Sequence, residues 1–157
     1  MDFSDILAVI ALAASPISEL RGAIPVAMGV YHFTWWQAYI IAVIGNLLPV
    51  PIVLLFMNIV TRYLSRWSFF DRIFQWIFRT VRRRGEKITN WHFAGLMLFV
   101  AIPLPVTGAW TGSILSVLTK FRFWPSFFAI LAGILISGVI VTTLSVLGWQ
   151  LAGIIGG

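Results

Sequence analysis

Two apolar stretches of this chain are interrupted at their middles by proline and polar residues, and no other feature constrains the fold as strongly. They read ALAASPISELRGAIP (residues 11–25) and FVAIPLPVTGAWTGS (residues 99–113). A lipid bilayer has no water to hydrogen-bond a broken backbone. Irregular chain is therefore tolerated at membrane depth only where protein buries it or where it lines a polar cavity. Two interruptions of the same kind indicate a transport site built between internal repeats.

Two other segments predict full transmembrane helices. Residues 36–60 and 124–149 contain no charged side chain, and each has about 25 residues, whereas roughly 20 suffice to cross the hydrocarbon core. Tryptophan, which prefers the membrane interface, begins both segments and ends the second. Pro49 and Pro51 predict a kink in the first of them. The composition, 60% hydrophobic and 10% charged, excludes an ordinary soluble domain.

Each interrupted stretch predicts a hairpin of two short helical legs. The four legs are residues 3–14, 16–29, 91–102 and 107–118. The first hairpin is broken at Ser15 and Pro16, which we expect to be the N-cap and the first residue of its second leg. The second hairpin is broken at Pro103 and Pro105. A leg of about 12 residues reaches roughly 18 Å, to the centre of a ~30 Å core or just beyond it.

Most of the positive charge lies in one segment. Eight of the eleven lysine and arginine residues fall between Arg62 and Lys87, next to the first full span. The positive-inside rule places such a loop in the cytoplasm, where it attracts anionic lipid headgroups, and we expect no nucleic-acid partner. Apolar residues recur at helical spacing over 65–87 and predict an amphipathic interfacial helix, with a solvated basic linker as the alternative. Its candidate membrane-anchoring residues are Arg72, Arg79, Arg82, Arg83 and Arg84.

The two halves of the chain repeat the same order of elements. We divide the chain into repeat one (1–60: re-entrant hairpin 3–30, span 36–60), a basic linker (61–90) and repeat two (91–149: re-entrant hairpin 91–119, span 124–149). Pro105 follows Pro16 by 89 residues, and Gly133 follows Gly45 by 88. We therefore expect one all-α integral membrane domain, residues 1–157, built from two inverted repeats.

The charges near the ends of these elements distinguish re-entrant hairpins from kinked full spans. If the basic loop is cytoplasmic and each broken stretch crosses completely, Lys120 and Arg122 lie outside. If each broken stretch returns to the face it entered from, both residues are cytoplasmic, and Asp2 and Asp5 lie outside. Only this second arrangement satisfies the positive-inside rule for ten of the eleven cationic residues, the remaining one, Arg21, being inside the membrane.

Glu19 and Arg21 are the only ionisable pair in the interrupted segments. A charge at membrane depth costs at least about 2.5 kcal/mol, so such residues usually face a cavity or a partner and mark a pathway. Glu19 is a candidate proton carrier, because desolvation favours the neutral form of a carboxyl group. Arg21 is a candidate to hold an anionic group through a forked pair of hydrogen bonds. Two positions apart on a helix, they need not pair directly. The alternative role is a structural ion pair or capping network that holds the hairpin tip.

Polar residues near the breaks complete the candidate pathway. They are Ser15, Ser18, Asn46, Thr107, Trp110 and Thr111. Two helix N-termini meeting at mid-depth would aim free N–H groups at an anion, and Thr107 and Thr111 could add hydroxyl ligands. The alternative is that these hydroxyls satisfy only the broken backbone. Asn46, one third of the way along its span, either joins helices or lines the site.

The chain lacks the residues that several classes of function require. The chain has no cysteine, which excludes disulfides, thiolate metal sites and cysteine nucleophiles. Its two histidines lie at expected interfaces without a third ligand, so we expect no metal and no cofactor. No catalytic triad, paired carboxylates or phosphate-cradling glycine motif is present, and we expect no enzymatic activity.

The strings SPISELRGAIPVAM and PLPVTGAWTGS resemble the bacterial and archaeal family of small multidrug export proteins over nearly the whole chain. The paired hairpins also resemble the DedA/VTT superfamily, which includes undecaprenyl-phosphate translocases and lipid scramblases. This resemblance implies a multi-pass transporter of a prokaryotic inner membrane, coupled to the proton gradient. Glu19 would match the embedded acid of that superfamily and Arg21 an embedded arginine. DedA proteins also have arginines near the second hairpin, whereas residues 103–113 contain none.

Taken together, the sequence predicts a small proton-coupled membrane transporter. It would export or flip a small amphipathic or anionic substrate through a site between the two hairpin tips. Its expected partners are membrane lipids, the substrate and a second copy of the chain, because two full crossings enclose little space. The competing interpretations are a DedA-like lipid-phosphate translocase or scramblase, and a non-transporting membrane-organising or assembly protein.

Overall fold

The computed structural model describes residues 2–64, 89–104, 107–119 and 121–155, and these residues form helices and no strands. Most of the basic linker, with the predicted interfacial helix, lies outside this part of the chain. Several residues singled out by the sequence lie outside it too: Arg72, Arg79, Arg82, Arg83, Arg84, Pro105 and Lys120.

The first interrupted stretch is a helical hairpin. Helix α1 (Phe3–Ala14) coincides with the predicted first leg, and α2 (Glu19–Gly29) ends where the second leg was expected to end. Helix α2 begins three residues later than Pro16, because Ser15–Ser18 form a separate turn. In that turn the Ser15 Oγ accepts a hydrogen bond from the Ser18 N–H at 3.2 Å. Ser15 therefore closes the turn instead of capping a helix that starts at Pro16.

The first long apolar segment is kinked, as its prolines predict. Helix α3 (Trp35–Leu47) and helix α4 (Pro49–Leu64) follow one another with a break at Leu48. Helix α3 starts with a capping box in which the Thr34 N–H donates to the Gln37 side chain at 3.0 Å. The break arises because Pro49 has no N–H to donate to the preceding turn.

The second interrupted stretch repeats the hairpin. Helix α6 (Thr89–Ala101) is followed by helix α7 (Ala109–Leu118), with residues 102–108 between them, and then by the 33-residue helix α8 (Phe123–Ile155). Within the described residues, the apolar segments long enough to cross a membrane are Trp35–Phe56 and Phe123–Leu151. They correspond to the two full spans expected from the sequence.

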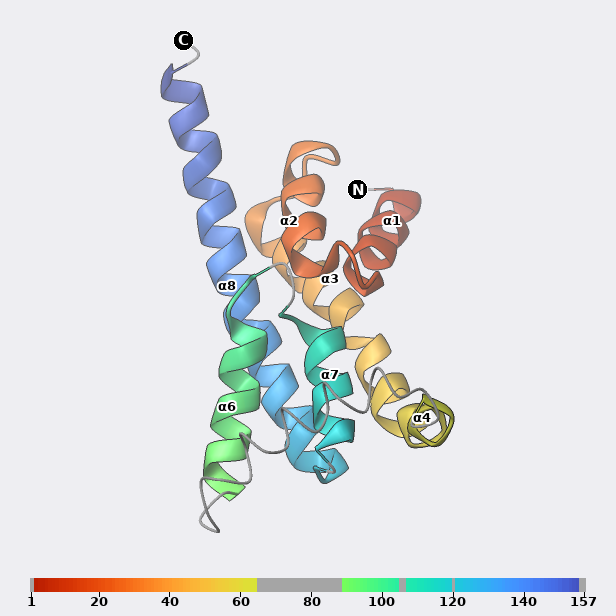
Figure 1. Cartoon of the computed structure of the whole chain (residues 1–157). Helices are drawn as coiled ribbons and strands as arrows, with labels where there is room; N and C mark the ends of the chain where they lie inside the picture. The colour runs from red at the N-terminus through yellow and green to blue at the C-terminus, as the bar shows by residue number, and fades with distance from the viewer. Residues whose placement is uncertain (1, 65–88, 105–106, 120, 156–157) are drawn as a thin grey trace.

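The hairpins approach each other from opposite ends of the molecule (Figure 1). The α1–α2 hairpin starts and ends at the end of the molecule where the N-terminus and the last part of α8 lie, whereas the α6–α7 hairpin starts and ends at the far end, where α8 begins. Their tips meet beside the middle of α8, which runs the full length of the molecule. Helix α2 packs on α3 and α8, while α7 packs on α4 and α8. This arrangement places both backbone breaks at the same level.

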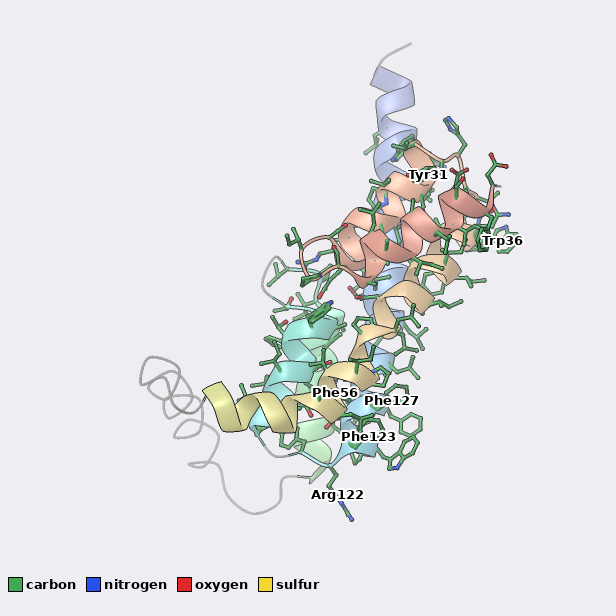
Figure 2. All side chains as sticks on the ribbon, turned by 90° about the vertical axis from the view of Figure 1, so that its right-hand side faces the viewer. Tyr31, Trp36, Phe56, Arg122, Phe123 and Phe127 are labelled. Atoms are coloured by element: carbon green, nitrogen blue, oxygen red, sulfur yellow. The ribbon has the colours of Figure 1, made fainter. Side chains whose placement is uncertain are left out.

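Aromatic and charged side chains gather at the two ends. Tyr31 and Trp36 lie near the end with the termini, and Phe123, Phe127 and Arg122 lie at the opposite end (Figure 2). Phe123 and Phe127 stack with ring centroids 6.1 Å apart. Aromatic rings at both ends of an apolar helical body are typical of a protein that sits across a bilayer.

Two glycines allow each long helix to cross the first leg of its own hairpin closely. A Cβ at Gly45 would lie 2.8 Å from the Ile10 carbonyl oxygen of α1, and a Cβ at Gly133 would lie 2.7 Å from the Met97 carbonyl oxygen of α6. Because backbone atoms cannot give way, neither position accepts a side chain at this helix separation. Each close crossing joins a long apolar segment to the first leg of the hairpin that precedes it in the chain.

We expect Gly45→Ala and Gly133→Ala each to destabilise the protein by about 1–3 kcal/mol, the usual cost of overpacking a tight contact. Thermal unfolding in detergent micelles measures the effect. Gly95→Ala is the matched control, because nothing lies within 4 Å of a Cβ there and alanine favours a helix. Equal stability of Gly45→Ala and Gly95→Ala would contradict the close crossing.

Candidate functional site

The tips of the two hairpins are joined by hydrogen bonds between residues far apart in the sequence. The Trp110 indole Nε1–H donates to the Ala14 carbonyl at the end of α1, at 3.0 Å. The Trp110 backbone N–H donates to the Glu19 Oε1 at 3.4 Å. In the other direction, the Arg21 Nη1 donates to the Leu104 carbonyl in the loop of the second hairpin. Each tip therefore satisfies broken backbone of the other.

Glu19 occupies the centre of this junction. It is the first residue of α2, its side chain is buried, and its φ of +48° lies in the left-handed region, which is unfavourable for residues other than glycine. Trp110 is the second residue of α7, whose N-cap is Gly108 and has no side chain to cap the helix. The Glu19 carboxylate thus acts as a cap for α7 from the opposite hairpin, near the positive end of that helix.

Gly108 leaves the space that this carboxylate fills. A Cβ at Gly108 would overlap the carboxylate atoms of Glu19. The backbone of Gly108 is extended, with φ of 163°, so its conformation does not itself require glycine. The requirement is one of space alone. The sequence contained no signal for this pairing, because it depends on how the two hairpins dock.

Arg21 links the junction to a cavity. Its Nη2 lies 3.4 Å from the Glu19 Oε2, so the two residues form an ion pair. Helical spacing did not require this pair. It forms because Glu19 lies at the first position of α2 with a non-helical φ. The Arg21 side chain keeps 22% of its surface exposed, whereas the Glu19 side chain keeps 6%.

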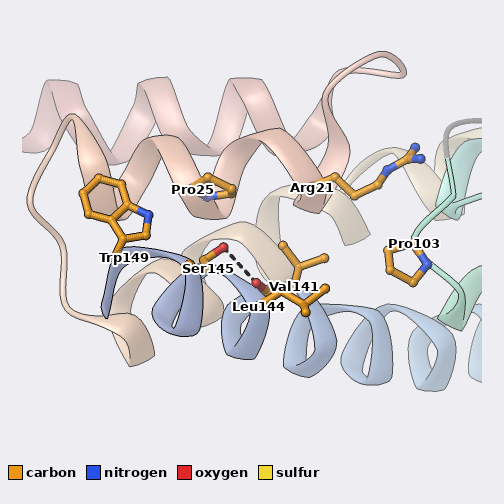
Figure 3. Close-up of a pocket in the computed structure, with 8 residues that line it drawn as sticks. Arg21, Pro25, Pro103, Val141, Leu144, Ser145 and Trp149 are labelled. Atoms are coloured by element: carbon orange, nitrogen blue, oxygen red, sulfur yellow. Dashed lines mark hydrogen bonds between the residues drawn. The ribbon is translucent and has the colours of Figure 1, made fainter. Parts of the chain in front are cut away.

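The cavity is an open-sided groove of about 800 Å³ between α2 and α8 (Figure 3). It extends from the hairpin tips, where Arg21 and Pro103 lie, along α8 to Trp149. Its lining residues are Arg21, Pro25, Pro103, Val141, Leu144, Ser145, Gly148 and Trp149. The sequence pointed to Arg21 but missed the contribution of α8, because an apolar helix gives no periodic sign of which face borders a cavity.

The remaining candidates from the sequence take up local hydrogen bonds. The Thr107 hydroxyl donates to the Ile102 carbonyl at 2.6 Å and accepts from the Leu104 N–H at 3.2 Å. The Thr111 hydroxyl donates to the Gly108 carbonyl at 3.4 Å. Thr107, Trp110 and Thr111 thus share the second tip, but none of them lines the groove.

Three further candidates lie apart from the groove. Ser15 and Ser18 bond to each other within the first tip. Asn46 is buried on α3, and its Oδ1 has no hydrogen-bond partner in the described part of the chain. Within the described ranges, no three His, Cys, Asp or Glu side chains come together as a metal site would require.

Comparison with known proteins assigns this chain to a family. No curated protein and no solved structure matches the chain. A family model described as "Putative small multi-drug export protein" matches residues 19–140, from Glu19 at the first tip to the middle of α8. That match covers most of the chain and agrees with the two long apolar segments of a membrane protein. The chain belongs to this family of small multidrug export proteins.

Proposed function

We propose that this protein is a proton-coupled transporter that exports or flips a small amphipathic or anionic substrate past the junction of the two hairpin tips. One observation carries the proposal: the buried Glu19 carboxylate joins the two hairpins, while its partner Arg21 borders a groove beside the same junction. An acid buried at membrane depth beside a cavity is typical of proton pathways in transporters. We propose a carrier and not an enzyme.

The proposed fold in the membrane has two re-entrant hairpins related as inverted repeats. Two features support it. The two outer ends of each hairpin lie at the same end of the molecule, and Arg122 lies at the end where α6 begins (Figures 1 and 2). The equivalent close crossings at Gly45 and Gly133 support the repeat. In this orientation the basic linker is cytoplasmic in a prokaryotic inner membrane, and the groove faces the outside.

The contacts of Glu19 hold the two hairpin tips together, and protonation of this carboxylate can release them. Protonation of Glu19 removes its negative charge, which weakens both the pair with Arg21 and the cap on α7. The tips then lose the contact that Glu19 makes between them, and one repeat can rock against the other around the site. Because a single chain encloses little space with two full spans, we propose that it works as a homodimer in contact with membrane lipids.

The topology can be measured directly in this cysteine-free chain. Ser4 and Arg122 are both exposed and lie at opposite ends of the described structure. In intact cells we expect a membrane-impermeant thiol reagent to label Ser4→Cys from outside, and to label Arg122→Cys only after the membrane is opened. Four complete crossings would reverse both results.

We expect Glu19→Gln to abolish proton coupling, because the amide resembles the neutral acid but cannot release or bind a proton. The assay follows uptake of the anion anilinonaphthalene sulfonate into proteoliposomes with and without a pH gradient. Asp2→Asn, an exposed acid far from the tips, should retain gradient-driven uptake. Gradient-driven uptake of normal size in Glu19→Gln would eliminate the proton-carrier role.

The connection between the tips also predicts an effect of Trp110 on the stability of the fold. Trp110→Phe keeps an aromatic ring but removes the N–H that bonds to Ala14, so we expect a loss of about 1–3 kcal/mol in the free energy of unfolding. Trp124→Phe is the control, because that side chain is 64% exposed at the end of the molecule. Chemical unfolding in micelles compares the two, and equal stabilities would argue against a connection between the tips.

A further inference from the structure

We infer that the groove between α2 and α8 binds a single-tailed organic anion, with the acidic head on Arg21 and the alkyl tail along α8 toward Trp149. This inference deepens the proposed function by naming its substrate class. It rests on that function only for the transport step, since binding can be measured without transport.

The charge of the groove favours an anion over a cation. Arg21 is the charged residue among the described residues that line the groove, whereas Glu19 is buried in the junction and does not line it. A cationic ligand would therefore meet the guanidinium without reaching the carboxylate. An anionic head would find a partner of opposite charge in a largely apolar setting, where screening by water is weak.

Arg21 has donors left for such a head group. A guanidinium carries five N–H donors, and the described contacts of Arg21 use one toward Leu104 and one toward Glu19. The contact to Glu19 is long, at 3.4 Å, and the side chain is partly exposed. The planar fork of arginine matches the paired oxygens of carboxylates, sulfonates and phosphates.

The rest of the groove suits one alkyl tail. Val141, Leu144, Gly148 and Trp149 lie on α8, and residues 141–149 extend over about 12 Å of helix. The Ser145 hydroxyl donates a hydrogen bond to the Val141 carbonyl oxygen at 2.8 Å, so this donor needs no partner on a ligand (Figure 3). A volume of about 800 Å³ lies within the range of small-molecule sites.

Trp149 forms the outer end of this path, against α2. A Cβ at Gly29 would overlap the Trp149 ring, so the ring rests on the end of α2. An amphipathic ring at the membrane interface is suited to shield the end of a tail that extends outward from mid-depth. The groove thus changes from charged at Arg21 to apolar and aromatic at Trp149.

A second groove gives an internal control. A cavity of about 460 Å³ between α3 and α8 is lined by uncharged residues: Trp35, Tyr39, Val139, Thr142, Thr143, Val146 and Leu147. An alkyl chain that binds only by burial of apolar surface would enter this groove as well. A ligand that needs a cation would not.

The experiment uses Ser145→Cys in the groove and Thr143→Cys in the control groove, each the single cysteine of the full-length chain in nanodiscs. We measure the rate of reaction with a water-soluble methanethiosulfonate in the presence of alkyl sulfonates. We expect decyl sulfonate to slow the reaction at Ser145→Cys at least tenfold and to leave Thr143→Cys unchanged. The concentration for half protection should fall about fourfold for each added methylene.

Head-group specificity separates the outcomes. Decyltrimethylammonium should give no protection, and Arg21→Gln should remove protection by decyl sulfonate. Since Arg21→Gln also loosens the tips, Gly148→Leu provides a second variant: a Cβ there meets open space, and the added side chain fills the groove while Arg21 stays in place. Gly148→Leu should raise the half-protection concentration for decyl sulfonate at least tenfold.

Three results would overturn the inference. Equal protection by the cation, or equal protection at Thr143→Cys, would show that the ligand binds only by burial of apolar surface. Protection by a two-chain anionic phospholipid, without protection by decyl sulfonate, would make the groove a lipid site. Protection combined with no gradient-driven uptake would reject the transport function and leave the binding site standing.

Discussion

The docking of the two hairpins depends on the Glu19 carboxylate, which lies at the N-terminus of α7. Two hairpins that reach the middle of an apolar body leave broken backbone there, and each hairpin satisfies only part of it with its own residues. Glu19 caps α7 from the opposite hairpin, Trp110 bonds to the last carbonyl of α1, and Arg21 bonds to the loop before α7. Because these contacts are reciprocal, docking of the two hairpins satisfies backbone groups of both.

The local structure could be predicted from the sequence because prolines and apolar lengths determine it. Pro16 and Pro103 mark the breaks, Pro49 marks the kink, and the predicted legs agree with α1 and α6 to within two residues at each end. The start of α2 was predicted three residues too early, because the four-residue turn Ser15–Ser18 is closed by its own serines. Such a turn competes with the helix through local hydrogen bonds that composition does not reveal.

The site could be predicted only in part. Glu19 and Arg21 stand out because charges are rare in such sequence, but their partners are set by the docking of the hairpins. The fit of Gly108 to Glu19 and the groove face of α8 both depend on contacts between residues about 90 or more positions apart. Thr107 was singled out as a candidate ligand, yet its hydroxyl bonds to the loop backbone, the alternative that the sequence left open.

The space at Gly108 limits which side chains can stand together at positions 19 and 108. Since the backbone at Gly108 is extended, an alanine there is excluded only by the length of the side chain at position 19. Aspartate is one methylene shorter than glutamate and would withdraw from that space, but it would also leave the start of α7 without its cap. In this chain, any side chain at position 108 therefore requires a shorter one at position 19, and the cost of that exchange is the cap on α7.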